Sequence, residues 1–217
     1  MTDKNLTWIT GIIDRSGSMK AIRGETQAGW SAYLHEQMGS PGRVWVSLTQ
    51  FDFAVEVVYD FTPIHAVPAY DLRPRGTTAL LDAIGLTVNR LGQRLAEMPE
   101  PERPGSVIVA ILTDGYENAS REFTAEQIKA MVQRQQDAYQ WLFVFLAANQ
   151  DAVFTGQRYG VYDTHAMTFT GANTTEAFAA AGANTRAYRA GTAAGQGYAQ
   201  TVALSQFSQE QRSDAVD

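Results

Sequence analysis

The sequence contains no cysteine among its 217 residues. This absence excludes disulfide bonds, thiolate metal sites and cysteine nucleophiles. A chain of this length, of which 45% is hydrophobic, can bury a sizeable core without crosslinks. Oxidising and reducing compartments both tolerate a chain without cysteine, and we expect a cytoplasmic protein.

Long hydrophobic runs and an excess of basic residues are also lacking. No stretch approaches the roughly 20 apolar residues of a membrane-spanning helix. Residues 1–5 carry one lysine and one aspartate, and the apolar run after them is short, so we expect no secretory signal. The net charge of -6 argues against a general nucleic-acid-binding protein, whose affinity would rest on neutralising phosphates. We therefore expect neither a membrane nor a nucleic acid as partner.

The usual phosphate-binding and histidine motifs are missing as well. Neither Gly-x-x-x-x-Gly-Lys-[Ser/Thr] nor Gly-x-Gly-x-x-Gly follows the first apolar run, so a nucleotide-binding loop is not supported. His35, His65 and His165 are far apart in the chain and lack the spacing of metal ligands. We interpret them as structural or surface residues.

Strand-like and helix-like segments alternate along the chain. Apolar runs predict strands at residues 6–13, 44–51, 55–61, 106–112, 141–146 and 166–170. Apolar residues at helical spacing, with their flanking polar residues, predict helices at residues 20–38, 79–97, 125–137, 150–159 and 174–189. Only residues 52–54 separate the second strand from the third, which favours an antiparallel hairpin.

This alternation predicts an α/β fold of the doubly wound, three-layer α/β/α type. We expect a six-stranded sheet that is mostly parallel, with one antiparallel edge strand. Residues 1–191 are predicted to form the domain. Residues 192–217 are predicted to form a polar C-terminal tail, which is either flexible or a short docking helix.

The run Asp14-Arg15-Ser16-Gly17-Ser18 is the most informative part of the sequence, because it follows the first predicted strand directly. Ligands of open α/β sheets bind outside the carboxyl ends of the strands. One carboxylate and two hydroxyls at alternate positions, which share a face in an extended loop, suit Mg²⁺, Mn²⁺ or Ca²⁺. On its own, a Ser-Gly-Ser segment is more often a turn or a helix cap.

Two later segments place further oxygen ligands after or before predicted elements. Arg75-Gly76-Thr77-Thr78-Ala79-Leu80 leads into a predicted helix, and Leu112-Thr113-Asp114-Gly115 ends a predicted strand. Alone, Thr78 would be a helix cap and Asp114 a turn residue. Because three such segments occur in order at one predicted sheet edge, we expect a metal site there.

The three segments resemble the loops of a von Willebrand factor A (VWA) domain, which form its metal-ion-dependent adhesion site (MIDAS). The resemblance covers most of the chain and extends to a bacterial and phage subgroup, through Asp-Arg-Ser-Gly-Ser-Met and Ala147-Ala148-Asn149-Gln150-Asp151. It implies that five residues bind the metal: Asp14, Ser16, Ser18, Thr78 and Asp114. Thr77 replaces the second glycine of the family's usual Gly-Gly-Thr and is a weaker rival for the ligand.

The resemblance also implies Mg²⁺, with Mn²⁺ or Ca²⁺ as alternatives, and aspartates that often act through bridging water. Few direct carboxylates would leave the ion electrophilic, so it would accept an Asp or Glu of a protein partner. We predict a partner-binding rim of Arg15, Thr77 and Glu117. For Arg15 a solvated side chain is an equal alternative, and for Glu117 and its neighbour Asn118 a solvated loop is the simpler interpretation.

Other acidic residues have simpler interpretations, and other functions stay open. Asp52 follows the second strand and could lie near the same sheet edge, but a turn residue of the hairpin is the simpler interpretation, and Asp82 is predicted to support the start of a helix. We expect a binding module and no enzyme. One alternative is a Mg²⁺-dependent phosphatase or phosphotransferase with Asp14 as nucleophile, although Ser16 stands where a second acid would be preferred. Another is a structural subunit of a phage or bacterial assembly.

Overall fold

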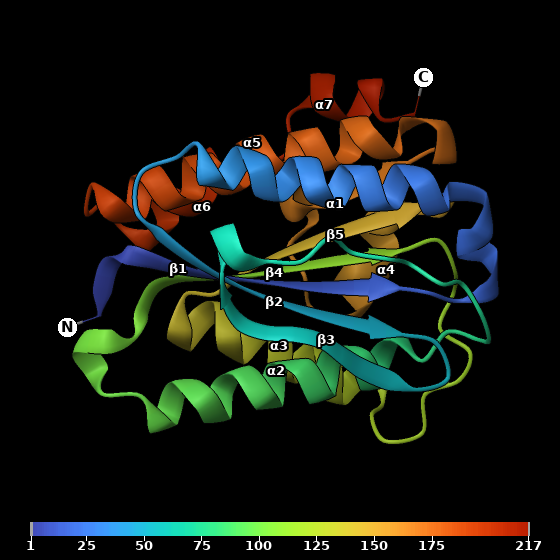
Figure 1. The fold of residues 1–217 in the computed structure, drawn as a ribbon, viewed down its shortest axis with the longest axis horizontal. Helices are drawn as coiled ribbons and strands as arrows, with labels where there is room; N and C mark the ends of the chain where they lie inside the picture. The colour runs from blue at the N-terminus through green and yellow to red at the C-terminus, as the bar shows by residue number, and fades with distance from the viewer. Residues whose placement is uncertain (1, 217) are drawn as a thin grey trace.

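The computed structural model describes residues 2–216, which form a six-stranded sheet in the order β3-β2-β1-β4-β5-β6 (Figure 1). The strands are β1 (Asp3–Asp14), β2 (Arg43–Phe51), β3 (Val55–Pro63), β4 (Pro104–Thr113), β5 (Leu142–Ala148) and β6 (Ala166–Phe169). Edge strand β3 runs antiparallel to β2, and all other pairs are parallel. The predicted fold class and the antiparallel edge strand are confirmed.

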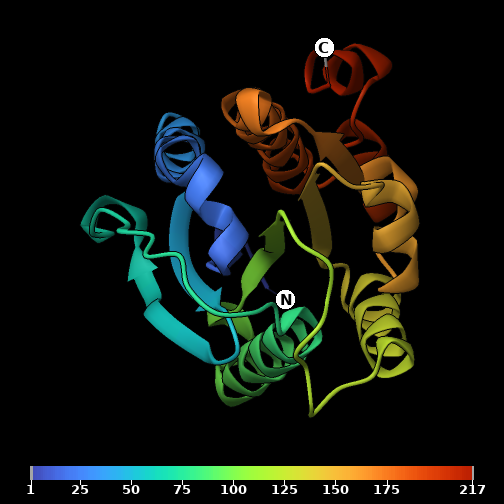
Figure 2. The same cartoon turned by 90° about the vertical axis from the view of Figure 1, so that its right-hand side faces the viewer.

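Helices cover both faces of this sheet (Figures 1 and 2). One face carries α1 (Arg23–Met38), α5 (Thr174–Ala193), α6 (Tyr198–Leu204) and α7 (Gln209–Asp214). The other carries α2 (Leu80–Glu97), α3 (Ala125–Tyr139) and α4 (Ala152–Arg158). Short 3-10 helices are η1 (Gly17–Ile22), η2 (Ile64–Ala66), η3 (Glu100–Glu102), η4 (Asp163–His165) and η5 (Gly171–Asn173).

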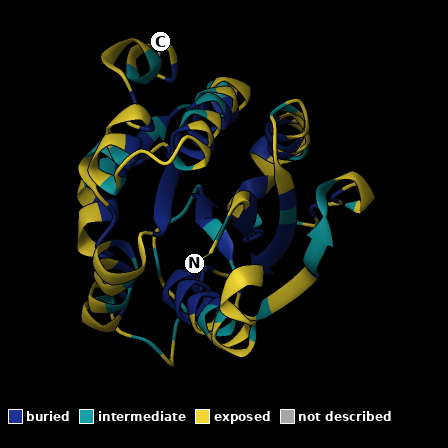
Figure 3. Cartoon of the chain, turned by 90° about the vertical axis from the view of Figure 1, so that its left-hand side faces the viewer, coloured by how far each residue is buried: buried dark blue, intermediate teal, exposed yellow. Residues whose placement is uncertain are grey.

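Strand β4 shows how the sequence forms the two cores. Val107, Val109 and Ile111 pack in the core beneath α2 and α3, whereas Ile108 and Leu112 pack in the core beneath α1 and α5. All five are buried, because successive strand residues face opposite sides of a sheet that is covered on both faces (Figure 3). The uninterrupted apolar run is the sequence signature of this double burial.

Most predicted boundaries shift by one to three residues, and two of the differences bear on packing. Residues 17–19, which we expected to be loop, begin the 3-10 helix η1 that leads into α1. Helix α5 continues through Gly191 to Ala193, four residues beyond the predicted helix end at residue 189. A Cβ at Gly191 would lie 2.9 Å from Gln196 Oε1 and 3.1 Å from Thr201 Cγ2. The glycine is therefore explained by the close packing of α6 against α5.

Residues 198–216, which we call the C-terminal arm, pack beside β6. Thr170 N donates a hydrogen bond to Ala215 O, and Phe207 N donates one to Thr164 O, each at 2.9 Å. Arg212 donates to the backbone oxygens of Asp163 and Ala166. The arm lies within the predicted tail and is helical over α6 and α7, while a domain boundary at residue 191 stays a prediction. No helix within residues 2–216 has the length and apolar character needed to cross a membrane.

Candidate metal site

Three loops meet where the parallel strands β1 and β4 end. Loop 1 (residues 14–18) follows β1, loop 2 (residues 75–79) leads into α2, and loop 3 (residues 114–123) follows β4. Since β1 and β4 are neighbours, loops 1 and 3 lie side by side at the edge that Figure 2 turns to the viewer. Gly17 N donates to Gly76 O at 3.2 Å, which joins loop 2 to loop 1. The fold thus brings together all three segments that the sequence singled out.

Asp14 is completely buried at the start of loop 1. Its Oδ1 accepts a hydrogen bond from Ser16 N at 2.6 Å, and its Oδ2 accepts one from Thr113 Oγ1 at 2.7 Å. Among the described residues, no lysine or arginine forms an ion pair with it. A buried carboxylate without a cationic partner is costly, so this position favours a bound cation.

Burial has the same electrostatic effect on both aspartates of the site. It raises the pKa of Asp14 to about 6, against the hydrogen bonds from Thr113 and Ser16, and the charge of Asp114 adds to this rise. Burial likewise raises the pKa of Asp114, against a hydrogen bond from Ser18. A divalent cation would favour the charged form of both groups.

The two serine hydroxyls of loop 1 face each other and loop 3. Ser16 Oγ and Ser18 Oγ lie 3.1 Å apart, and Ser18 Oγ donates to Asp114 Oδ1 at 2.6 Å. The prediction that these hydroxyls share a direction is met, but its reason is wrong. Gly17 and Ser18 already belong to η1, so a 3-10 turn rather than an extended loop brings the hydroxyls together.

Gly115 borders the space between the oxygens of the three loops. A Cβ placed on Gly115 would lie 3.2 Å from Thr78 Oγ1, 3.7 Å from Ser18 Oγ and 3.9 Å from Asp14 Oδ2. Thr78 is buried, and its hydroxyl makes no hydrogen bond with any residue that the structure describes. One oxygen from loop 2 and two from loop 1 therefore face a single small space beside loop 3.

Loop 3 is held against loop 2 and α2 through hydrogen bonds to its backbone. Asn118 and Thr78 are joined twice, since Thr78 N donates to Asn118 Oδ1 at 2.9 Å and Asn118 N donates to Thr78 O at 3.0 Å. The carboxylates of Glu117 and Asp82 accept from further backbone N–H groups. Those groups belong to Leu81, Ala119 and Ser120 for Glu117, and to Arg121, Glu122 and Phe123 for Asp82.

The three predicted rim residues have different surroundings. Thr77 is exposed beside the buried Thr78. Arg15 is only 5% exposed, and its guanidinium is bound by Asp52 and Glu56. The carboxylate of Glu117 is engaged by backbone groups, as described above. Arg15 is therefore not a solvated side chain, and partner contact by any of the three stays a prediction.

Sequence reasoning missed two residues that support the site. Asn118 was interpreted as part of a solvated loop, yet it fixes the backbone of Thr78. Gln150 is 6% exposed, and its Nε2 donates to Gly115 O at 3.1 Å, which holds Gly115 in place. The motif that contains Gln150 was a usable signal for it, whereas nothing local in the sequence distinguishes Asn118 from an ordinary loop residue.

The donor set fits a hard divalent cation. The five predicted ligands supply three hydroxyls and two carboxylates, all oxygen donors of the kind that Mg²⁺, Mn²⁺ and Ca²⁺ prefer. Within residues 2–216, no group of three or more His, Asp or Glu side chains is placed to hold a metal ion. The mixed hydroxyl and carboxylate set at the edge of the sheet is therefore the candidate metal site.

Comparisons with known proteins find similarity in structure alone. No protein-family model matches the sequence, and no curated protein matches it either. Proximal thread matrix protein 1 from the mussel byssus, solved with a zinc-occupied MIDAS motif, has a TM-score of 0.56 and 14% identity, covering 79% of this chain and 46% of that chain. A von Willebrand factor type A protein from Catenulispora acidiphila has a TM-score of 0.54 and 13% identity, covering 83% of this chain and 43% of that chain.

A third similar structure is a single domain of comparable length. The vWF domain of the type V pili tip protein Mfa5 from Porphyromonas gingivalis has a TM-score of 0.52 and 14% identity, covering 80% of this chain and 92% of that chain. This chain spans less than half the length of the mussel and Catenulispora proteins. At such identities the likeness establishes the fold alone.

Proposed function

Because the chain has the fold of a von Willebrand factor A domain, we propose that it is a divalent-metal-dependent protein-binding module. The observation that carries this proposal is the space beside Gly115, on which oxygens of Asp14, Ser18 and Thr78 converge. The zinc-occupied MIDAS motif of the mussel protein supports metal binding in this fold. We propose Mg²⁺ for this chain, with Mn²⁺ or Ca²⁺ as alternatives, because the donors are all oxygens.

In this proposal the hydroxyls of Ser16, Ser18 and Thr78 hold the ion. Asp14 and Asp114 supply negative charge, either directly or through water. Hydroxyl ligands are neutral, so they cancel less of the ion's charge than carboxylates would. The ion then supplies an electrophilic position for an Asp or Glu of a partner protein, as a charge-assisted contact.

A metal titration with a matched pair of threonine variants tests the ligand assignment. Thr78→Val removes the hydroxyl and keeps the side-chain shape, so we expect the affinity for Mg²⁺ to fall at least about tenfold by calorimetry. Thr77→Val is the control and should leave the affinity unchanged. The titration is repeated with Mn²⁺, Ca²⁺ and Zn²⁺ to establish which ion is preferred. If the parent protein binds none of these metal ions, the proposal is wrong. If Thr78→Val binds Mg²⁺ as tightly as Thr77→Val does, Thr78 is not a metal ligand.

Partner binding is tested by affinity capture from the native host. We expect a protein that is captured with Mg²⁺ to be lost in chelator and with the Asp14→Ala variant. Replacement of the partner's acidic residues, one at a time, then identifies the carboxylate that reaches the ion. Full capture in chelator would show that binding does not depend on the metal. The expected cytoplasmic location is a separate part of this proposal, tested by fractionation of the host.

Two activity measurements separate this function from its alternatives. A phosphatase screen with Mg²⁺ tests the enzyme, and turnover that Asp14→Asn abolishes would replace the binding module with a phosphotransfer enzyme. If metal-site variants are incorporated into a host assembly as well as the parent protein is, the result would favour a structural subunit. Two of the similar proteins named above, a thread matrix protein and a pili tip protein, support a non-enzyme.

A further inference from the structure

Asp52 lies in the turn between β2 and β3, outside the three loops, yet it is completely buried. Its Oδ1 accepts a hydrogen bond from Ala54 N at 2.8 Å. Its Oδ2 accepts hydrogen bonds from Arg15 Nε at 3.0 Å and from Arg75 Nε at 2.7 Å. One carboxylate oxygen therefore closes the turn, while the other binds two guanidinium groups.

The two guanidinium groups come from different loops of the metal site. Arg15 precedes Ser16 in loop 1, and Arg75 is the first residue of loop 2. Arg75 N also donates to Arg15 O at 2.7 Å. At the other end of loop 2, Ala79 N donates to Asp52 O at 2.8 Å. Asp52 thus holds both ends of loop 2 and the first turn of loop 1.

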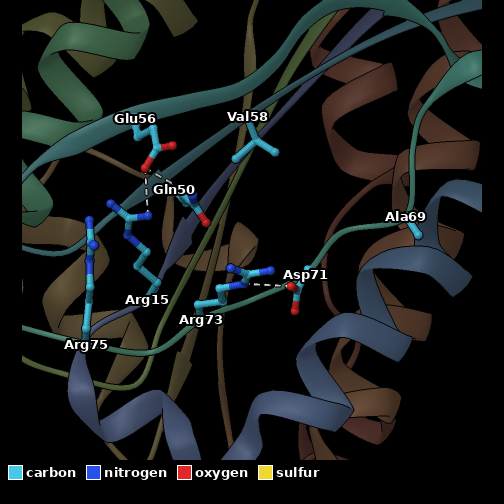
Figure 4. Close-up of a pocket in the computed structure, with 8 residues that line it drawn as sticks. All are labelled: Arg15, Gln50, Glu56, Val58, Ala69, Asp71, Arg73 and Arg75. Carbon is cyan, nitrogen blue, oxygen red and sulfur yellow. Dashed lines mark hydrogen bonds and ion pairs between the residues drawn. The ribbon is translucent and has the colours of Figure 1, made fainter.

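The Asp52–Arg15 pair is shielded from water, which strengthens its effect on the loops. The exposed fractions of the two side chains are 0% and 6%. Figure 4 shows Arg15 and Arg75 side by side at a pocket of about 530 Å³, where Arg15 also pairs with Glu56 at 2.7 Å. The Glu56 side chain is 54% exposed, so salt screens its contact with Arg15 more than it screens the contact with Asp52.

From these contacts we infer that Asp52 is a positioning residue of the metal site, which sets the distance between Ser16 in loop 1 and Thr78 in loop 2. It acts through Arg15, Arg75 and the backbone of Ala79, and it does not touch the ion. The inference rests on the proposed function, because it concerns the geometry of the same site. A turn aspartate needs only the contact to Ala54. The pairing with two arginines is the additional observation.

Metal titration of Asp52→Asn tests this role. The asparagine keeps an oxygen for Ala54 N but removes the charge that binds Arg15 and Arg75. We expect the affinity for Mg²⁺ to fall by about 10-fold or more, the usual effect of losing a residue that orients metal ligands. Arg75→Gln is the second variant. Its side chain is 58% exposed, so it removes one contact with Asp52 without leaving a buried charge. A smaller loss of affinity, in the same direction, is expected.

Two controls distinguish positioning from general destabilisation. Glu56→Gln removes the exposed partner of Arg15 and should leave the affinity for Mg²⁺ within about twofold of the parent, because it touches neither Arg75 nor Ala79. Val132→Ala, on the buried face of α3, is expected to lower the melting temperature at a site outside the three loops. It should leave metal affinity unchanged.

The outcomes separate this inference from the proposed function. If the parent binds Mg²⁺, and Asp52→Asn and Arg75→Gln bind it equally well, the inference is wrong while the proposed function stands. The inference is also wrong if Val132→Ala loses as much affinity as Asp52→Asn at an equal fall in melting temperature. If Asp52→Asn fails to fold, Arg75→Gln decides alone. A parent protein without metal affinity overturns both the inference and the proposed function.

Discussion

Gly115 borders the space between the three loops in which we propose that the ion binds. A Cβ placed on Gly115 would lie 3.2–3.9 Å from side-chain oxygens of Thr78, Ser18 and Asp14. These are the nearest atoms apart from those of the residues next to Gly115 in the sequence. A side chain of any size would compete with a ligand for that space. The glycine is therefore explained by the site rather than by backbone conformation, since its φ is not positive.

We expect Gly115→Ala to lower the affinity for Mg²⁺ by about 10-fold or more while the protein stays folded, because the added methyl group lies among the metal donors. Calorimetry measures the affinity, and circular dichroism checks the fold. Gly92→Ala in α2 is the matched control, since nothing lies within 4 Å of the position of its Cβ. That variant should bind metal normally, and it should gain about 0.5–1 kcal/mol of stability. Unchanged affinity in Gly115→Ala would place the ion elsewhere.

At this scale the sequence indicates candidate metal ligands more readily than residues that support them. Asp14, Ser16 and Ser18 were recognisable because they follow a buried strand at a telling spacing. Asp52 and Asn118 could be placed near the edge but not given a role, since that role depends on contacts 37 and 40 residues away along the chain. Such long-range contacts form only when the loops come together in the folded protein, so no local sequence pattern predicts them.

Among the elements, the C-terminal arm contacts a buried histidine beside β6. His165 is completely buried, with Ser205 Oγ 2.9 Å from its Nε2 and Thr164 Oγ1 3.1 Å from its Nδ1. Burial, with a smaller contribution from the charge of Arg212, lowers the pKa of His165 from 6.5 to about 4. The neutral imidazole is thus part of the contact between η4 and the arm.

Lowering the pH should therefore reduce the free energy of unfolding, because His165 is neutral in the folded protein and becomes charged on unfolding. A pKa that is lowered in the folded state means that this contribution is fully present above pH 6.5 and is lost as the pH falls towards 4. At about 1.4 kcal/mol per pKa unit, the loss approaches about 3 kcal/mol at pH 4. Urea unfolding in chelator, from pH 7 to 4, measures it. The fall should be shallower in His165→Gln and unchanged in His65→Gln, whose histidine is exposed. If the free energy of unfolding falls equally with pH in the parent and in His165→Gln, the prediction is wrong.

The elements themselves were largely predictable from the sequence. Buried strands such as β4 and β5 appear as apolar runs, and α2 places Leu80, Ile84, Val88 and Leu91 at helical spacing on its buried face. The arm was harder to predict, because α6 and α7 have 7 and 6 residues and few buried side chains. Helices that short are stabilised by packing on the rest of the molecule and leave little pattern of their own.

For the whole molecule, the most exposed aromatic side chains gather at the metal edge. Tyr116 is 68% exposed, Phe53 64% and Phe154 59%. They follow β4, β2 and β5 respectively, so all three lie near the carboxyl ends of parallel strands. Exposed aromatic residues are enriched in protein interfaces. In the proposed function, these side chains would be apolar neighbours of the partner's acidic residue.

We expect Tyr116→Ala and Phe53→Ala each to lower the affinity of the partner captured with Mg²⁺ by about 10-fold or more, while the affinity for Mg²⁺ stays unchanged. Surface plasmon resonance with that partner measures the first and calorimetry the second. Tyr139→Ala is the control, because Tyr139 is 56% exposed at the end of α3. If all three variants bind the partner as the parent does, the aromatic residues lie outside the interface.

The carboxylates of Asp82 and Glu117 hold loop 3 through its backbone N–H groups, without using its outward side chains. The side chains of Tyr116, Arg121 and Glu122 are exposed. Their identities can therefore change while the backbone that carries Asp114 and Gly115 keeps its path. Substitutions at these outward positions would change which partner is bound without moving the proposed metal ligands. A library randomised at those three positions would be a practical starting point for engineered binders on this scaffold.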